Sequence, residues 1–194
     1  MINHYFSKEV TAESNPQEIT YEFGKHKYRF ITDNGVFSVG KMDFASDILI
    51  QTIPPLSGSL LDMGCGYGPI GIVLAKEYEL ELTQVDINPR AINLSKQNAT
   101  KNNVISNVLQ SDSFSQISGL FDTIAINPPI HAGKDVIFAM YSGAHKHLCI
   151  GGALYIVIFK KHGADSSRSY ILDLFGNCEI IYKKKGLYVL KANK

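Results

Sequence analysis

The spacing of apolar residues changes along the chain and predicts different elements in its two parts. Between residues 20 and 38, apolar and aromatic side chains alternate with polar ones around a central GKHK segment. This alternation predicts a β-hairpin, followed by a turn at the DNG sequence of 33–35. The segment 45–53 has apolar residues at helical spacing and stops at two prolines, so it predicts a helix.

From residue 60 onward, short apolar runs alternate with longer amphipathic segments. The short runs predict buried strands at 60–63, 81–86, 107–112, 121–127 and 151–160. The longer segments predict a helix beginning at Pro69 and helices near 88–103, 135–148 and 164–175. The third of these presents one apolar face, made of Val136, Ile137, Met140, Ala144 and Leu148. The last residues, CEIIY and LYVLK, predict a closing hairpin. We therefore expect an α/β fold, with a mostly parallel sheet, helices on both faces and an antiparallel strand at the sheet's end.

Composition restricts the class of protein further. Apolar residues make up 45% of the 194 residues and charged residues 19%, as in an ordinary globular protein. The amino terminus lacks an apolar signal segment, and no apolar run is long enough to cross a bilayer. We therefore expect one cytoplasmic domain, with an N-terminal extension at 1–55 and a core at 56–194, and no membrane partner. Three widely spaced cysteines without zinc-ligand spacing indicate free thiols and no metal site.

The net charge of +1 is unevenly distributed. Residues 160–194 carry eight basic and three acidic groups, a net charge of +5, which leaves −4 on the remainder. A basic end of this kind suits a polyanionic partner, although a solvated surface explains it as well.

A glycine-rich loop follows the first predicted strand. The sequence LLDMGCGYGPIG (60–71) spaces Gly64, Gly66 and Gly68 two residues apart and places Pro69 where a helix begins. Glycines allow a sharp turn and a close approach of the backbone to a ligand. The GxGxG pattern differs from the GxGxxG fingerprint of dinucleotide-binding proteins. It resembles motif I of class I S-adenosylmethionine-dependent methyltransferases, although a plain tight turn also explains it.

Acidic residues end the next two predicted strands. Asp86 ends the second strand, where a carboxylate can accept hydrogen bonds from both hydroxyls of a ribose. The alternative is an Asp that helps to cap the helix beginning at Asn88. Asp112 ends the third strand and is expected at the same edge of the sheet, since ligands bind beyond the carboxyl ends of parallel strands. A surface turn is the alternative for Asp112.

The fourth predicted strand ends in Asn127, Pro128, Pro129 and Ile130. An exocyclic base amine such as guanine N2 is a poor nucleophile, because its lone pair is delocalised into the ring. The side-chain oxygen of Asn127 and the carbonyl of Pro128 can accept its two N–H bonds and direct the lone pair toward a methyl donor. The prolines restrict the backbone, so that both acceptors are in place before substrate binds. An isolated histidine such as His131 more often has a structural or substrate-positioning role than a catalytic one.

Several longer segments carry a specific resemblance. NPPIHAGK (127–134) is similar to the small-subunit ribosomal RNA guanine-N2 methyltransferases of type C, and so are HYFS (4–7), TDNGVFSVGKMDFASDILI (32–50), LLDMGCGYGPIG and IFKKHGADS (158–166). The resemblance implies a Rossmann-like class I methyltransferase fold with a seven-stranded sheet. It also implies S-adenosyl-L-methionine as cofactor, RNA as partner and an activity in ribosomal RNA processing. This chain departs from the family in having Ile130 where an aromatic residue is commoner, and in lacking the second, degenerate domain of larger members.

The resemblance also implies which residues form the site. It places Phe37, Ser38, Lys41 and Asp43 close to the cofactor. The residues expected to act on the substrate amine are Asn127, Pro128, Pro129 and Ile130. Those expected to bind the cofactor are Phe37, Lys41, Asp62, Gly64, Cys65, Gly66, Gly68, Asp86, Ile87, Asp112, Ser113 and Asn127.

Three other functions remain open at this point. The same chemistry serves adenine N6, or a protein glutamine amide in enzymes with an NPPY sequence. The position after NPP is Ile130 and the carboxyl-terminal end is basic, which suits RNA better than a protein substrate. A non-catalytic S-adenosylmethionine-binding module is the third, and degenerate modules usually lose the glycine loop or the NPP sequence, which this chain retains.

Overall fold

The computed structural model describes residues 12–194, so that the HYFS segment lies outside the described residues. A two-stranded antiparallel sheet comes first, formed by β1 (Gln17–Phe23) and β2 (His26–Thr32), and α1 (Phe44–Thr52) follows it. Both the hairpin and the helix expected in this part of the chain are confirmed.

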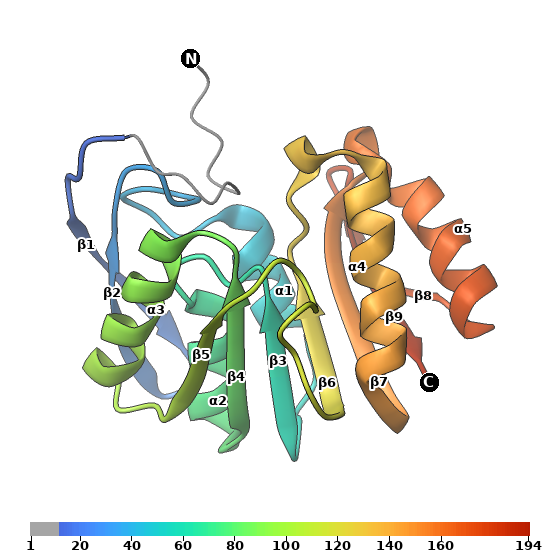
Figure 1. The fold of residues 1–194 in the computed structure, drawn as a ribbon, viewed down its shortest axis with the longest axis horizontal. Helices are drawn as coiled ribbons and strands as arrows, with labels where there is room; N and C mark the ends of the chain where they lie inside the picture. The colour runs from blue at the N-terminus through green and yellow to red at the C-terminus, as the bar shows by residue number, and fades with distance from the viewer. Residues whose placement is uncertain (1–11) are drawn as a thin grey trace.

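The rest of the described chain forms a seven-stranded sheet with helices between its strands (Figure 1). The strands are β3 (Ser59–Met63), β4 (Glu81–Asp86), β5 (Ser106–Gln110), β6 (Phe121–Ile126), β7 (Leu148–Phe159), β8 (Glu179–Lys184) and β9 (Leu187–Asn193). The helices are α2 (Pro69–Tyr78), α3 (Pro89–Lys101), α4 (Lys134–His147) and α5 (Ala164–Phe175), with the short 3₁₀ turns η1 (Ile130–Ala132) and η2 (Lys160–His162).

The strand order is β5-β4-β3-β6-β7-β9-β8. Strands β3 to β7 are parallel, and β9 runs antiparallel to both of its neighbours, β7 and β8. The fold is therefore the α/β, Rossmann-like fold with a mostly parallel sheet and a terminal antiparallel hairpin. One detail differs from expectation: the antiparallel strand is not at the edge. The hairpin folds so that β9 lies inside the sheet and β8 forms its edge.

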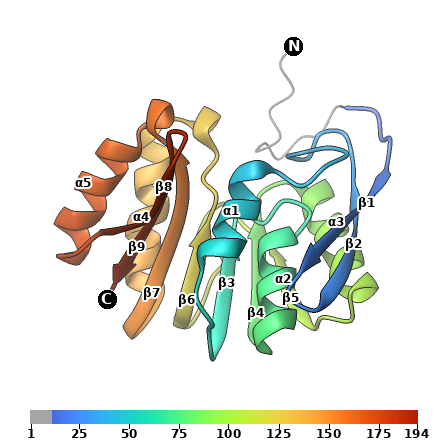
Figure 2. The same cartoon turned by 180° about the vertical axis from the view of Figure 1, so that it is seen from behind.

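Alternate residues of each strand pack on opposite faces of the sheet. On one face, Leu60, Leu82 and Val157 join a core covered by α1, α2, α3 and β2. On the other, Leu61, Val85 and Ile156 join a core covered by α4 and α5. Figures 1 and 2 show these two layers from opposite sides, with α4 nearest the viewer in one and α1 and α2 in the other.

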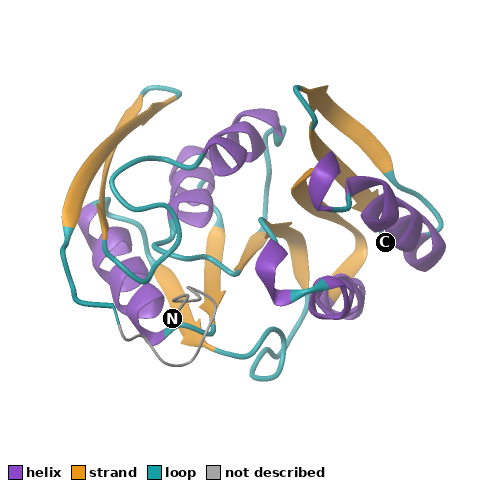
Figure 3. Ribbon diagram, turned by 90° about the horizontal axis from the view of Figure 1, so that it is seen from above, coloured by secondary structure: helices purple, strands orange, loops and turns teal. Residues whose placement is uncertain are grey.

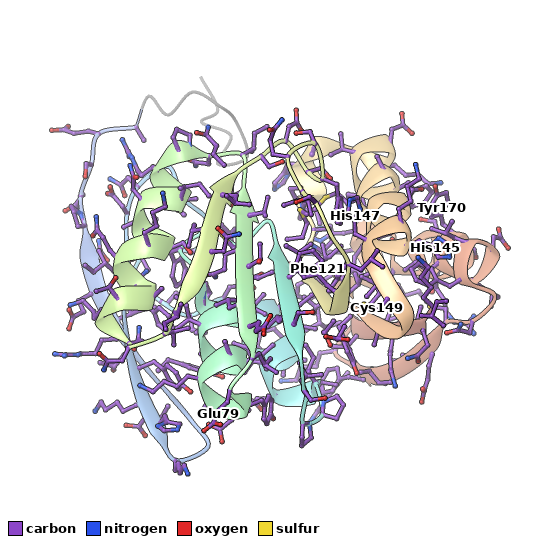
Figure 4. All side chains as sticks on the ribbon, turned by 60° about the horizontal axis from the view of Figure 1, so that its bottom comes forward. Glu79, Phe121, His145, His147, Cys149 and Tyr170 are labelled. Atoms are coloured by element: carbon purple, nitrogen blue, oxygen red, sulfur yellow. The ribbon has the colours of Figure 1, made fainter. Side chains whose placement is uncertain are left out.

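Helix α4 is rotated slightly relative to the face expected from its sequence. Its buried residues are Ile137, Met140, Tyr141 and Ala144, whereas Val136 is 46% exposed and Leu148 is the first residue of β7. Tyr141 belongs to the buried face instead, and its hydroxyl donates to Ser167 of α5 at 3.2 Å, whereas Val136 lies in the first turn of α4. Tyr170 of α5 stacks on Phe138 at 4.1 Å and shares a 2.7 Å hydrogen bond with Ser142, which joins the two helices. Figure 4 labels Tyr170 beside α4.

Helix α3 fastens the N-terminal hairpin to the sheet. The side chain of Asn98 accepts from the Ile31 N–H at 2.7 Å and donates to the Ile31 carbonyl at 2.9 Å. One turn further along, Asn102 makes the same two bonds with Arg29. The edge of β2 is thus paired with side-chain amides, which satisfies backbone groups that a strand edge would otherwise expose.

Candidate functional site

A cavity of about 350 Å³ lies at the edge where the parallel strands end. Figure 3 looks down on this edge and shows the loops that leave the strands there. The walls of the cavity come from the loops after β3, β4, β5 and β6, from the end of β7 and from the start of α1. Residues from distant parts of the sequence meet here because parallel strands share their carboxyl end.

The glycine loop between β3 and α2 forms the floor of the cavity. The N–H groups of Gly64 and Cys65 both donate to the Val85 carbonyl, at 2.8 and 2.9 Å, which fixes the loop against β4. Gly64 and Gly66 have φ angles of +75° and +57°, and a Cβ on either would meet nothing within 4 Å. Their backbone is therefore open to the cavity, and a ligand can approach it closely.

Gly68 has a different role from the two glycines before it. It is the N-cap of α2 with φ +90°, and a Cβ there would lie 2.9 Å from side-chain atoms of Gln84, Ile72 and Ser95. Backbone conformation and close packing both require glycine at this position. Gly68 is buried beneath the loop and does not line the cavity.

Asp86 connects the end of β4 with the glycine loop. Its carboxylate accepts from the N–H of Gly66 at 2.8 Å and from the N–H of Asn88 at 2.9 Å. Burial raises its pKa, and these backbone hydrogen bonds oppose the increase. The side chain of Asn88 caps α3 through the N–H groups of Arg90 and Ala91, so Asp86 is not the helix cap. Asp86 lines the cavity, as a ribose-binding carboxylate requires.

Asp62 lies beneath the loop, only 1% exposed. Its Oδ2 accepts from the Gly71 N–H at 2.9 Å and from Nε2 of Gln84 at 3.1 Å, whereas its buried Oδ1 has no hydrogen-bond partner among the described residues. Desolvation raises the pKa of Asp62 to about 6. Asp62 therefore supports the loop from behind and does not line the cavity.

Asn127 follows β6 and stands beside the start of α1. Its Nδ2 lies 3.2 Å from Oδ2 of Asp43 and 3.0 Å from Oγ of Ser46. A carboxylate only accepts hydrogen bonds, so the NH₂ group of the amide must face Asp43. The following loop is held by a 2.9 Å bond from the Ala132 N–H to the Pro129 carbonyl. Asn127 therefore lines the cavity with its NH₂ group directed toward Asp43 and Ser46.

The family model of the methyltransferase small domain matches residues 27–191, which are most of the chain. The chain belongs to the methyltransferase small domain family. It is a class I methyltransferase of this family, similar to the small-subunit type C enzymes, and its cofactor is S-adenosylmethionine.

Relatives of this methyltransferase have different lengths. It is 40% identical over 200 residues to a protein of Bacillus subtilis called uncharacterized protein YbxB, and the match spans both chains completely. It is 34% identical over 168 residues to ribosomal RNA small subunit methyltransferase C of Vibrio cholerae, covering 82% of this chain and 48% of that one. The methyltransferase therefore spans about half the length of its type C relatives.

A solved structure is similar over nearly the whole methyltransferase. The T. thermophilus 16S rRNA N2 G1207 methyltransferase (RsmC), in complex with AdoMet and guanosine, superposes with a TM-score of 0.82 and 25% identity. The superposition covers 92% of this chain and 50% of the other.

The methyltransferase brings most of the expected site residues to one cavity. Those that line it are Phe37, Gly64, Cys65, Gly66, Asp86, Ile87, Asp112, Ser113, Asn127, Pro128, Pro129 and Ile130. Asp43 and His131 line it as well. Four expected residues do not, namely Ser38, Lys41, Asp62 and Gly68. Lys41 is exposed, and its carbonyl accepts from the Ser38 hydroxyl at 2.8 Å within the loop before α1.

Sequence reasoning did not single out several other lining residues, among them Ser46, Phe159 and His162. Phe159 and His162 lie edge to face with ring centroids 5.7 Å apart at the end of β7. Burial lowers the pKa of His162, and the nearby charges of Lys161 and His131 lower it further. The sequence held one signal for Ser46, its position three residues after the N-cap Asp43, which is typical of the start of a helix.

Within residues 12–194, no three His, Cys, Asp or Glu side chains are grouped so as to hold a metal ion. None of the helices there combines the length and the apolar character needed to cross a membrane. All three cysteines are free, and burial raises the pKa of the Cys65 thiol beside the cavity.

Proposed function

We propose that this methyltransferase modifies the N2 amine of a guanine in ribosomal RNA, in the small subunit. The observation that carries the proposal is the orientation of Asn127. Because its NH₂ group faces Asp43 and Ser46, its Oδ1 is the acceptor that the amide offers to a substrate amine. An amine with two N–H bonds matches an acceptor of this kind.

The cavity fits the cofactor in size and chemistry. Its volume of about 350 Å³ lies in the range of small-molecule sites. The open backbone at Gly64 and Gly66 would hold the cofactor from below, and Asp86 would accept from its ribose hydroxyls. When bound, S-adenosylmethionine supplies an electrophilic methyl group.

The residues of the NPPI segment would prepare the amine for attack. Oδ1 of Asn127 and the carbonyl of Pro128 accept its two N–H bonds and direct the nitrogen lone pair toward the methyl group. The Pro129 carbonyl is already bonded to Ala132, so that it holds the loop rather than the substrate. Such preorganised acceptors stabilise the positive charge that develops on nitrogen in the transition state. The nitrogen becomes acidic once methylated and releases its proton without a strong base.

A substrate base in the cavity would contact the ring of Phe159, since position 130 has Ile in place of an aromatic residue. Ile130 and Phe159 both line the cavity, one after β6 and the other at the end of β7. Phe159 therefore offers the aromatic surface that Ile130 lacks, and base-aromatic contacts are a general means of holding an unstacked base.

Charge at the same edge of the sheet favours RNA over a protein substrate. The N–H of Lys160 donates to the Gly186 carbonyl at 2.7 Å, which joins η2 to the tip of the β8–β9 hairpin. Lys160, Lys161, Lys183, Lys184 and Lys185 are all exposed. These five lysines would contact phosphates beside the cavity. The names of the type C relatives, and of the structure that contains guanosine, support guanine in small-subunit RNA.

The test compares ribosomal RNA from cells with and without the gene by nucleoside mass spectrometry. We expect N2-methylguanosine to disappear from small-subunit RNA, to return with the wild-type gene and to stay absent with Asn127→Ala. Loss of N6-methyladenosine instead would show that the substrate base is adenine. Loss of a methylated glutamine with unchanged RNA would make the substrate a protein. Purified protein that binds S-adenosylmethionine but methylates neither would be a binding module.

A further inference from the structure

A hydrogen-bonded cluster joins helix α1 to the NPPI segment, although the two lie more than 80 residues apart in sequence. Oδ2 of Asp43 accepts from the Ser46 N–H at 2.8 Å and from the Ser46 hydroxyl at 3.1 Å. The same oxygen lies 3.2 Å from Nδ2 of Asn127, and Oγ of Ser46 accepts from this nitrogen at 3.0 Å. The residue that caps α1 therefore also contacts the residue expected to receive the substrate.

We propose that Asp43 and Ser46 are positioning residues that hold the Asn127 amide with its oxygen toward the substrate amine. The inference rests on the proposed function, in which Asn127 Oδ1 is an acceptor. An unrestrained amide can rotate by 180° and present its NH₂ group instead. A donor would then face the N–H bonds of the substrate, and the interaction would become repulsive.

Asp43 and Ser46 contribute to this orientation in different ways. The carboxylate of Asp43 attracts the NH₂ group and excludes the rotated state, since two oxygens would then face each other. It also polarises the amide, because negative charge beside the NH₂ group increases electron density on Oδ1 and makes it a stronger acceptor. The Ser46 hydroxyl donates its hydrogen bond to Asp43, so that Oγ accepts from the Asn127 NH₂ group through a lone pair.

The surroundings of the cluster keep it rigid. Ser46 is 3% exposed, and Leu49 and Ile50 of the same helix are fully buried. The hydroxyl of Tyr21 donates at 2.7 Å to Asp47 in the first turn of α1, which connects the helix to β1. The N-terminal hairpin thus supports α1, and α1 supports Asn127. Misplacing a catalytic group by about 1 Å is enough to cost on the order of a hundredfold in rate.

The test is a double-mutant cycle on the full chain, with small-subunit ribosomal RNA from cells lacking the gene as substrate. Ser46→Ala removes the hydroxyl and keeps the bond between Asp43 and the Ser46 N–H that caps the helix. Asp43→Asn removes the charge and keeps a residue that caps helices well. Each is made alone and together with Asn127→Ala, and kcat, KM and the Kd for S-adenosylmethionine are measured. Thr52→Ala is the control, because the Thr52 hydroxyl donates within α1, to the Ile48 carbonyl.

We expect Ser46→Ala to lower kcat by about tenfold, the scale of one hydrogen bond, with KM and the cofactor Kd changed less than about twofold. Asp43→Asn should lower kcat at least as much. In the Asn127→Ala background neither change should lower kcat further, because its target is gone. Thr52→Ala should retain wild-type kcat.

Three results would overturn the inference. Unchanged kcat in Ser46→Ala, beside a large loss in Asn127→Ala, would refute the positioning role and leave the proposed function standing. An equal loss from Ser46→Ala in both backgrounds would show that the hydroxyl acts on the fold instead. Near-normal kcat in Asn127→Ala would refute the proposed function and this inference together.

Discussion

The N–H of Gly66 donates a 2.8 Å hydrogen bond to the carboxylate of Asp86, which lies 20 residues further along the chain. This bond connects the glycine loop after β3 to the end of β4, and a second bond from the Asn88 N–H holds the other carboxylate oxygen. Asp86 therefore shapes the loop before any ligand arrives. Asp86 also lines the cavity, where its carboxylate can accept further hydrogen bonds.

The first prediction concerns Asp86→Ala. Removing the carboxylate should weaken S-adenosylmethionine binding by about 1.5–3 kcal/mol, the scale of hydrogen bonds to a charged group. Isothermal titration calorimetry measures the change. The fold should persist, because Asp86 stands at a strand end beside the cavity.

Asp122→Ala is the matched control for Asp86. Asp122 is also an aspartate that accepts hydrogen bonds, from the backbone and hydroxyl of Ser59, but it is the second residue of β6, at the opposite end of the sheet. It should leave cofactor affinity unchanged. Equal affinity of Asp86→Ala and wild type would exclude Asp86 from the cofactor site.

The second prediction separates binding from chemistry at Asn127. Asn127→Ala should lower turnover by on the order of a hundredfold or more, because an oriented transition-state acceptor is lost. Cofactor affinity should change little. Steady-state kinetics and calorimetry on the same preparation measure both. Asn177→Ala, which removes an exposed amide far from the cavity, should keep normal turnover. A large loss of cofactor affinity in Asn127→Ala would assign this residue to binding instead.

The third prediction concerns the hairpin tip. Replacing Lys183, Lys184 and Lys185 together with alanine should weaken RNA binding and make the affinity less dependent on salt, because each phosphate contact releases counterions. Filter binding between 50 and 200 mM salt gives the slope. Cofactor affinity should be unaffected.

The control for the hairpin tip removes the same charge elsewhere. Lys25, Lys27 and Lys96 are exposed, and the first two stand in or beside the β1–β2 turn. Their combined replacement should leave the salt slope nearer to the wild-type value. Equal slopes for wild type and the hairpin-tip variant would make those lysines a solvated surface.

The fourth prediction uses the raised pKa of Asp62. Its pKa is about 6 in the folded protein against an ordinary value of 3.8, so between about pH 4 and 6 the folded state binds more protons than the unfolded state. The free energy of unfolding should therefore fall as pH rises through this window, by about 3 kcal/mol in total from this group.

Asp62→Asn should abolish this contribution. An amide keeps an oxygen that can accept from the Gly71 N–H, and it carries no charge to desolvate. Urea unfolding of the cofactor-free protein from pH 4 to 8 measures the effect. The free energy of unfolding of Asp62→Asn, relative to that of wild type, should increase as pH rises. A difference that stays constant with pH would show that Asp62 does not titrate in this window.

Local signals predicted the elements well. Pro69 and Asn88 each mark the start of a helix, because proline has the φ angle of a first helical residue and an Asn side chain can bond to free N–H groups. Strand β4 ends at Asp86 as expected, whereas β5 ends at Gln110, two residues before Asp112. Beyond Gln110, the Ser111 N–H still donates to the Asp86 carbonyl at 3.0 Å, and Ser113 then adopts a φ of +50°.

The sequence by itself determined the order of strands and helices, the glycine loop and the NPPI segment, since each depends on residues that are near neighbours in the chain. Only the tertiary structure decided how these segments meet. Asp43 and Ser46 approach Asn127 because α1 packs against β7 and β9. Asp62 and Asp86 point to the same face of the sheet, because Asp62 pairs with Gln84, two residues before Asp86. Asp62 lies within β3, beneath the loop, whereas Asp86 is the last residue of β4 and lines the cavity. Contacts across 80 residues arise from packing, and no local pattern encodes them.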